Sequence, residues 1–224
     1  MIRSVLGSRA SIGGVLGSGR GGAAAAWYLS GGVSAANCVA AYQPIRAVSL
    51  AASYVNLANP GTFDAAPGTA PAFDTATGWT FDAASSQYLT TGITPASGYS
   101  MIVRFSDISN ANSIIGQFTN NARFFISPNQ SGIVVYGSGQ FVTTSPGITS
   151  GVLAIAGQQG YRNGTADGAS IGTWTTTASY AIILGARNLV PINYGAGKIQ
   201  AAAIYNTTLT APQVAAISAA MAAL

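Results

Sequence analysis

Five aspartates are the side chains best suited to acid–base or metal chemistry in this chain of 224 residues. The sequence contains no glutamate and no histidine, which excludes triads that use imidazole as a base and metal centres ligated by histidine. A pair of carboxylates can cleave a glycosidic bond, and several converging carboxylates can hold calcium. The five aspartates are Asp64, Asp74, Asp82, Asp107 and Asp167.

Three of these aspartates follow a phenylalanine, in Phe63-Asp64, Phe73-Asp74 and Phe81-Asp82. Burial of the ring and an aspartate that starts a turn are a sufficient structural reason for this repeat. The spacing matches no calcium loop, and Asp107 and Asp167 form no close pair in sequence. We therefore expect no catalytic residue, no metal and no cofactor. An enzyme built on these aspartates is kept as a third alternative.

The single cysteine, Cys38, cannot form an internal disulfide or a cysteine metal cluster. It lies in a run of small residues with no adjacent basic side chain that would activate a thiol. We expect Cys38 to be a small buried residue.

Charge is scarce and unevenly placed. Only 6% of the residues are charged, against roughly 25% in an average soluble domain. The excess of +4 lies entirely in residues 1–46, which carry Arg3, Arg9, Arg20 and Arg46 and no acid. Residues 47–224 are balanced, and a surface without net charge promotes association. We predict an N-terminal basic, Gly/Ala-rich anchoring arm (1–46), a β-body (47–224) and a homo-oligomeric assembly.

The first 22 residues are rich in glycine, which makes a helix costly. Arg9 and Arg20 interrupt the apolar run that a secretory signal or a membrane span requires, so neither is expected. Arg3, Arg9 and Arg20 can meet nucleic acid phosphates, but so few charges make nucleic acid an unlikely partner. Residues 23–46 are expected to pack on the body or on a neighbouring subunit, with two helical turns over 35–42.

From residue 47, short strand-like runs alternate with turn clusters, which is typical of a sandwich or barrel. Asn163-Gly164 is the strongest hairpin signal, because a type I′ turn needs positive φ at both central residues. Thr210 and Gln213 form a capping box for a C-terminal helix whose apolar stripe docks on the sandwich or on another subunit. The expected strands are 99–105, 113–118, 123–127, 132–136, 152–156, 160–162, 182–184 and 198–205.

The body resembles the laminin-G-like, concanavalin-A-like jelly-roll family. The matching segments, in family order, are Trp79-Thr-Phe-Asp82 with Tyr88-Leu89, Tyr161-Arg-Asn-Gly164, Leu184-Gly185, Gly197-Lys-Ile199 and Ile204-Tyr-Asn206 with Leu209. The resemblance, which covers about residues 75–224, implies an all-β fold, a two-sheet antiparallel sandwich (jelly roll) followed by a short C-terminal helix. With the basic N-terminal segment, the predicted fold is such a sandwich with an extended N-terminal arm. Ala83 stands where the family usually has glycine, and the family's calcium ligand has no clear counterpart in this chain.

The segment 27–63 is similar to proteins encoded in structural regions of tailed phages and prophages. This resemblance implies a virion component, a head decoration, fibre or tail-associated protein. Together with the charge partition and the scarcity of catalytic groups, it predicts a non-enzymatic protein bound to other virion proteins through Arg3, Arg9 and Arg20. The sandwich then faces outward and can contact host-surface glycans. The alternative is a free carbohydrate-binding or adhesin module. In both, Tyr136 and Trp174 are the candidates for stacking on sugars, with core packing as the competing interpretation.

Overall fold

The structure is a computed structural model that describes residues 26–109, 113–119, 122–139, 141–172, 174, 177–187 and 192–224. Arg3, Arg9 and Arg20 lie outside the described residues. Two antiparallel sheets form a sandwich, as the sequence predicts, and α2 (Ala211–Ala222) follows the last strand. No helix in the described part of the chain is long and apolar enough to span a membrane.

Sheet A contains the longest described strand, β17, at its centre. Its order is β13 (Thr165–Asp167), β12 (Gln159–Arg162), β11 (Gly151–Ala156), β6 (Ser100–Ser106), β17 (Gly197–Tyr205), β4 (Gly78–Phe81) and β3 (Ala72–Asp74), with β1 (Cys38–Tyr42) also paired to β17.

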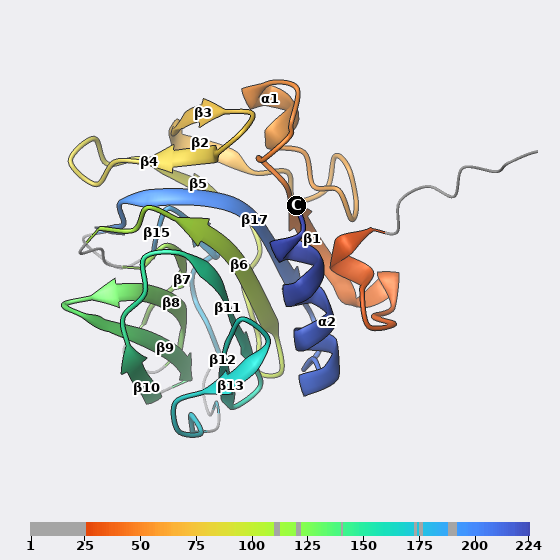
Figure 1. Cartoon of the computed structure of the whole chain (residues 1–224), viewed down its shortest axis with the longest axis vertical. Coiled ribbons are helices and arrows are strands. Elements are labelled where there is room, and N and C mark those ends of the chain that lie inside the picture. Colours follow the sequence, from red (N-terminus) through yellow and green to blue (C-terminus); the bar gives the residue numbers. More distant parts are fainter. Residues whose placement is uncertain are drawn as a thin grey trace, which may run out of the picture.

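Sheet B lies against one face of sheet A (Figure 1). Its order is β10 (Phe141–Pro146), β9 (Ile133–Gly139), β8 (Arg123–Gln130), β7 (Ile115–Gln117), β14 (Ile183–Leu184), β5 (Tyr88–Thr90) and β2 (Ala66–Thr69). A small separate ribbon joins β15 (Ala186–Arg187) and β16 (Asn193–Tyr194).

The central strands of sheet A are buried on both faces. The inner face of the sheet packs against sheet B in a core that includes Trp79, Phe105 and Ile204. Its outer face forms a second core with α2 and the 3-10 turn η1 (Trp27–Leu29). Figure 1 shows α2 lying beside β17 and β6, with the N-terminal turns next to it. Covering on both faces explains why β6, β11 and β17 are almost continuously apolar instead of alternating.

Local signals in the sequence predict two of these elements well. Asn163 and Gly164 have φ of 49° and 84° and connect β12 to β13 as a hairpin. The Thr210 hydroxyl accepts from the backbone of Gln213, whose side chain accepts in return from the backbone of Thr210. The apolar stripe of α2 docks on the sandwich, with Val214, Ile217 and Met221 buried in the outer core.

The N-terminal boundary of the sandwich differs from the predicted one. Residues 35–42 do not form two helical turns: the 3-10 turn η2 (Ala35–Asn37) leads directly into β1, which pairs with β17. Trp27 is buried in the outer core and donates to the side chain of Gln43. We therefore assign residues 26–46 to the sandwich. Of the predicted arm 1–46, residues 1–25 remain, and they lie outside the described residues.

The Asn56 side chain provides hydrogen-bond partners for backbone groups at the outer edge of β1. Asn56 follows the short helix α1 (Leu50–Ser53) and is fully buried. Its Oδ1 atom accepts from the backbone N–H groups of Ala41 and Ala58, at 2.9 and 3.0 Å. Its Nδ2 atom donates to the carbonyl oxygens of Val39 and Thr62, at 2.9 and 2.8 Å. One amide therefore replaces the neighbouring strand that this edge would otherwise need.

We predict that Asn56→Ala lowers the free energy of unfolding by about 2–4 kcal/mol, because buried backbone groups on β1 lose their partners. Urea unfolding followed by tryptophan fluorescence measures this loss. Asn59→Ala, at an exposed position three residues away, is the control and should change stability by less than about 0.5 kcal/mol. Equal stabilities of the two variants would contradict the role assigned to Asn56.

Candidate functional site

Three of the five carboxylates hold loops through backbone N–H groups. Asp74 and Asp82 accept from residues that follow them, which is the predicted turn role. Asp64 accepts from residues that precede it, and Phe63 is 42% exposed with φ of 58°, so the predicted burial of a ring and start of a turn do not apply there. The backbone donors are Asn56 and Gly61 for Asp64, Ala76 and Thr77 for Asp74, and Ala84 for Asp82.

The other two carboxylates form ion pairs. Asp107 Oδ2 lies 2.6 Å from Lys198 Nζ. The Asp107 side chain is exposed, and the Lys198 side chain is partly buried. Asp167 Oδ2 accepts from Tyr136 Oη and Ser145 Oγ, both at 2.7 Å, and from Arg162 Nε at 3.0 Å. Because Asp167 and Arg162 lie at the edge of sheet A and the two hydroxyls come from β9 and β10, this cluster joins the two sheets.

The Asp167 cluster favours a structural carboxylate over an acid catalyst. Partial burial raises the pKa of Asp167, but hydrogen bonds from Ser145 and Tyr136 and the charge of Arg162 outweigh it, so the pKa is lowered overall. The carboxyl group is therefore held in its ionised form. A general acid needs the opposite shift.

Tyr136 is not available for stacking on a sugar. Its side chain is 0% exposed and belongs to the core between the sheets, because inward-facing positions of β9 point at sheet A. Its hydroxyl donates to Asp167, and burial is the largest of the causes that raise its pKa. The alternative interpretation from the sequence, core packing, applies to Tyr136.

Cys38 is buried, as predicted. Burial raises the pKa of its thiol to about 12, so the thiolate is scarce at neutral pH.

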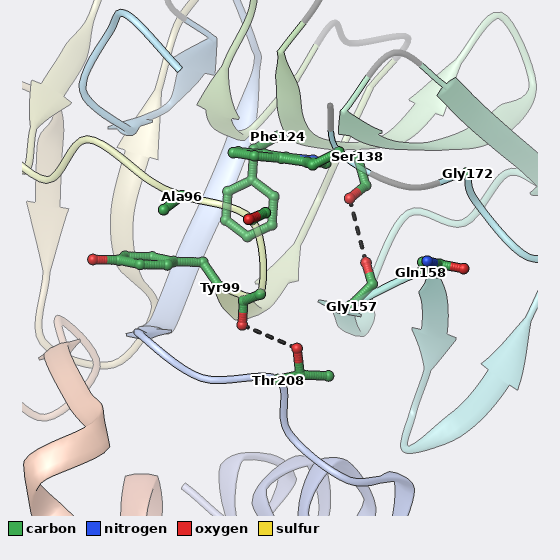
Figure 2. Close-up of a pocket in the computed structure, with 11 residues that line it drawn as sticks. Ala96, Tyr99, Phe124, Ser138, Gly157, Gln158, Gly172 and Thr208 are labelled. Atoms are coloured by element: carbon green, nitrogen blue, oxygen red, sulfur yellow. Dashed lines mark hydrogen bonds between the residues drawn. The ribbon is translucent and has the colours of Figure 1, made fainter. Parts of the chain in front are cut away.

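A pocket with a cavity of about 150 Å³ opens where loops from both sheets meet at one end of the sandwich. It is lined by residues 96–99 before β6, by Gly157 and Gln158 between β11 and β12, and by Thr208 between β17 and α2. Figure 2 shows the ring of Tyr99 on one side and Ser138, Gly157 and Gln158 on the other. These segments meet because β6 begins, and β11 and β17 end, at the same end of sheet A.

Hydrogen bonds hold the polar walls of the pocket in place. Thr208 Oγ1 donates to the carbonyl of Gly98 at 3.1 Å, and Ser138 Oγ donates to the carbonyl of Gly157 at 3.3 Å. Both bonds are drawn in Figure 2. The hydroxyl oxygens of Thr208 and Ser138 keep lone pairs that can accept from a ligand. The pocket therefore has fixed acceptors on opposite walls.

Trp174 supplies the largest aromatic surface of the pocket. Its ring is half-buried and packs edge-on against Phe124, with centroids 5.7 Å apart and an interplanar angle of 88°. A Cβ atom at Gly139 would lie 2.5 Å from Trp174 Cδ1, so only glycine lets the indole lie against the end of β9. Trp174 Nε1 is buried and has no hydrogen-bond partner among the described residues.

The pocket thus contains one of the two predicted sugar-stacking residues, Trp174. Tyr99, Ser138, Gln158 and Thr208 were not predicted. Three of them come from connections and Ser138 from the end of β9, all far apart in the chain, and only the resemblance to a jelly roll could have suggested that these segments meet.

Comparisons with known proteins show the fold. A Trypanosoma rangeli sialidase mutant displaying trans-sialidase activity aligns with a TM-score of 0.54 and 15% identity, over 84% of this chain and 34% of the sialidase. The binding domain of botulinum neurotoxin serotype C1 aligns with a TM-score of 0.57 and 11% identity, over 84% and 52%. The receptor-binding domain of the C/D mosaic neurotoxin gives 0.53 and 11%, over 83% and 52%.

This chain therefore spans about a third to a half of the length of these proteins. No protein-family model and no curated protein matches the sequence. At such low identity the likeness establishes a β-sandwich of this architecture and nothing finer.

We predict that Asp167→Asn lowers the free energy of unfolding at pH 7 by about 2 kcal/mol, because a charged acceptor of three hydrogen bonds is replaced. The pKa of Asp167 is lowered in the folded state, so its contribution is present above the unfolded value of about 3.9 and is lost as the pH falls through the folded value. The difference between wild type and variant should therefore shrink below about pH 4.

Urea unfolding between pH 2.5 and 7 measures this difference, with Asp74→Asn as the control because asparagine can keep the turn. A difference between wild type and Asp167→Asn that does not depend on pH would contradict the assignment.

Proposed function

We propose that this chain is a non-catalytic attachment module whose sandwich binds carbohydrate in the pocket beside Trp174. The observation that carries the proposal is the combination, in one open pocket, of an indole ring and fixed polar groups on facing walls. Sugars present apolar C–H faces that pack on aromatic rings and hydroxyls that need both donors and acceptors. A cavity of this size takes one sugar residue rather than a long oligosaccharide.

The unpaired Nε1 atom of Trp174 supports this proposal. This N–H is closed to solvent and lacks an acceptor, which costs free energy, and a sugar hydroxyl that accepts from it after a small movement of the indole would recover that loss. The groups on this pocket thus offer one donor at Trp174 and acceptors at Ser138 and Thr208.

Binding is favoured over hydrolysis by the roles of the carboxylates. The cleavage of most glycosides needs one carboxyl group to give a proton and another to act as base or nucleophile. Here every aspartate holds a turn or an ion pair, and none lines this pocket. The sialidase among the similar structures is an enzyme, but the shared fold says nothing about chemistry in this chain.

A place on a tailed-phage virion completes the proposal. It is supported by the basic excess of residues 1–46, by the electrically balanced body and by the resemblance of residues 27–63 to phage structural proteins. Residues 1–25, with Arg3, Arg9 and Arg20, would attach the protein to other virion proteins, and identical copies would present several pockets outward. A free carbohydrate-binding or adhesin module is the second candidate, since the pocket supports it equally well.

We predict that a glycan array detects selective binding by the full chain and that Trp174→Ala weakens it at least about tenfold, through loss of the stacking surface. Tyr180→Ala removes an exposed aromatic ring outside the pocket and should bind like wild type. Binding that survives in Trp174→Ala would place the sugar elsewhere, and an array without any signal would count against carbohydrate binding.

Removal of residues 1–25 tests whether this chain is an anchored virion protein or a free carbohydrate-binding module. The deletion leaves the sandwich intact from Ala26 onward, so it should preserve the unfolding midpoint and glycan binding. In particles assembled with the shortened chain, we expect the protein to be absent after purification of the particles. Retention at the wild-type level, measured by quantitative immunoblot, would contradict the anchoring role.

A further inference from the structure

Two arginines share an aromatic platform outside the core of sheet B. The Arg187 guanidinium lies 4.8 Å from the ring centroid of Phe118 and 4.6 Å from that of Phe125. The Arg123 guanidinium lies 5.2 Å from the Phe118 centroid. These distances are typical of cation–π contacts, so both guanidinium groups are held at the same Phe118 ring. We call Phe118, Arg123, Phe125 and Arg187 the arginine platform.

The strand register explains how the platform forms. Phe125 of β8 pairs with Gly116 of β7 and with Gly137 of β9. A Cβ atom at Gly137 would lie 2.3 Å from the Phe125 ring, and one at Gly116 would lie 2.4 Å from the Cα and Cβ atoms of Phe125, so only glycine at these two positions leaves room for Phe125. Arg123 is two residues before Phe125 and points to the same face. Arg187 comes from β15, a strand much later in the chain, and its guanidinium group lies over the Phe125 ring.

No carboxylate of the chain neutralises these two charges. The sequence has five aspartates and no glutamate, and all five aspartates lie in the described part of the chain. The ion pairs among the described residues join Asp107 to Lys198 and Asp167 to Arg162. The remaining aspartates accept from backbone N–H groups of their own loops. Two half-buried cations near each other without a counterion are costly.

Two further observations indicate that the two arginine side chains lack compensating partners. The Nε atoms of Arg123 and Arg187 are buried and have no hydrogen-bond partner among the described residues. The pKa of Arg187 is lowered, first by burial and then by the positive charge of Arg123. Both side chains nevertheless remain partly exposed, so a small solute can reach them.

We propose that the arginine platform binds an oxyanion, the carboxylate or sulfate group of an acidic glycan. Guanidinium groups suit this ligand because their N–H groups form a planar fork that matches two oxygens of one anion. The anion supplies the missing charge at the exposed parts of the side chains; the unpaired Nε–H groups are closed to solvent in this structure, so its oxygens accept from them only after the side chains shift. The identification of the ligand as a glycan rests on the proposed function, whereas the binding of an oxyanion does not.

The first test titrates the full chain with sodium sulfate at constant ionic strength, balanced with sodium chloride, and follows the arginine Nε–Hε signals by NMR. We expect the Arg123 and Arg187 signals to shift together and to saturate. Arg187→Gln should weaken sulfate binding at least tenfold. Arg46→Gln removes the same charge at an exposed position outside the platform and should leave binding unchanged.

Arg187→Lys keeps the positive charge and serves as a second variant if Arg187→Gln fails to fold. Lysine lacks the planar fork, so binding should still weaken severalfold. Signals that do not saturate, or that weaken equally in Arg46→Gln, would overturn the site, because they indicate only general attraction between charges.

The second test compares chondroitin sulfate with its chemically desulfated form in the same NMR experiment. We expect the sulfated form to shift both arginine signals at a lower concentration than inorganic sulfate does. Sulfate binding without tighter binding of chondroitin sulfate would overturn the glycan part of the proposal and leave an inorganic anion as the ligand. Stronger binding of single-stranded DNA than of chondroitin sulfate would overturn it in favour of nucleic acid. Neutral glycan binding at Trp174 succeeds or fails independently of these results.

Discussion

Burial of β17 on both faces is the constraint on which the rest of the structure depends. Small side chains such as Ala201, Ala202 and Ala203 let other elements pack closely above and below the strand, which pairs with β6 along one edge and with β4 and β1 along the other. The outer face would expose an apolar surface without α2 and the segment around Trp27. The C-terminal helix and residues 26–46 are therefore parts of the fold and not attachments to it.

The scarcity of acidic side chains decides what chemistry this fold can perform. Three of the five carboxylates hold loops, one forms a surface ion pair, and Asp167 joins the two sheets. This leaves the arginine platform without an internal counterion and the pocket beside Trp174 without an acid. Both features are suited to binding, one through an anion and the other through stacking and hydrogen bonds.

The sequence predicts the elements whose signals are local. The hairpin at Asn163-Gly164, the cap at Thr210 and the apolar runs of β6 and β11 need no knowledge of distant residues. β1 was not predicted, because the helix propensity of its alanines is overridden by pairing with a strand some 160 residues away in sequence. Tyr136 and Trp174 carry the same sequence signal. Only the fold distinguishes them: Tyr136 lies in β9 and is buried between the sheets, whereas Trp174 lies outside the described strands, at the margin of the same core, and lines a pocket.

The most direct test of carbohydrate binding uses the three tryptophans of the chain. The indole N–H groups of Trp27 and Trp79 donate to Gln43 and Ser53, whereas that of Trp174 has no partner among the described residues. Each indole gives one signal in a ¹H–¹⁵N NMR spectrum. Titration with the saccharide that binds most strongly on the array should move the Trp174 signal and leave the other two in place. A Trp174 signal that stays fixed while the saccharide binds would contradict the account.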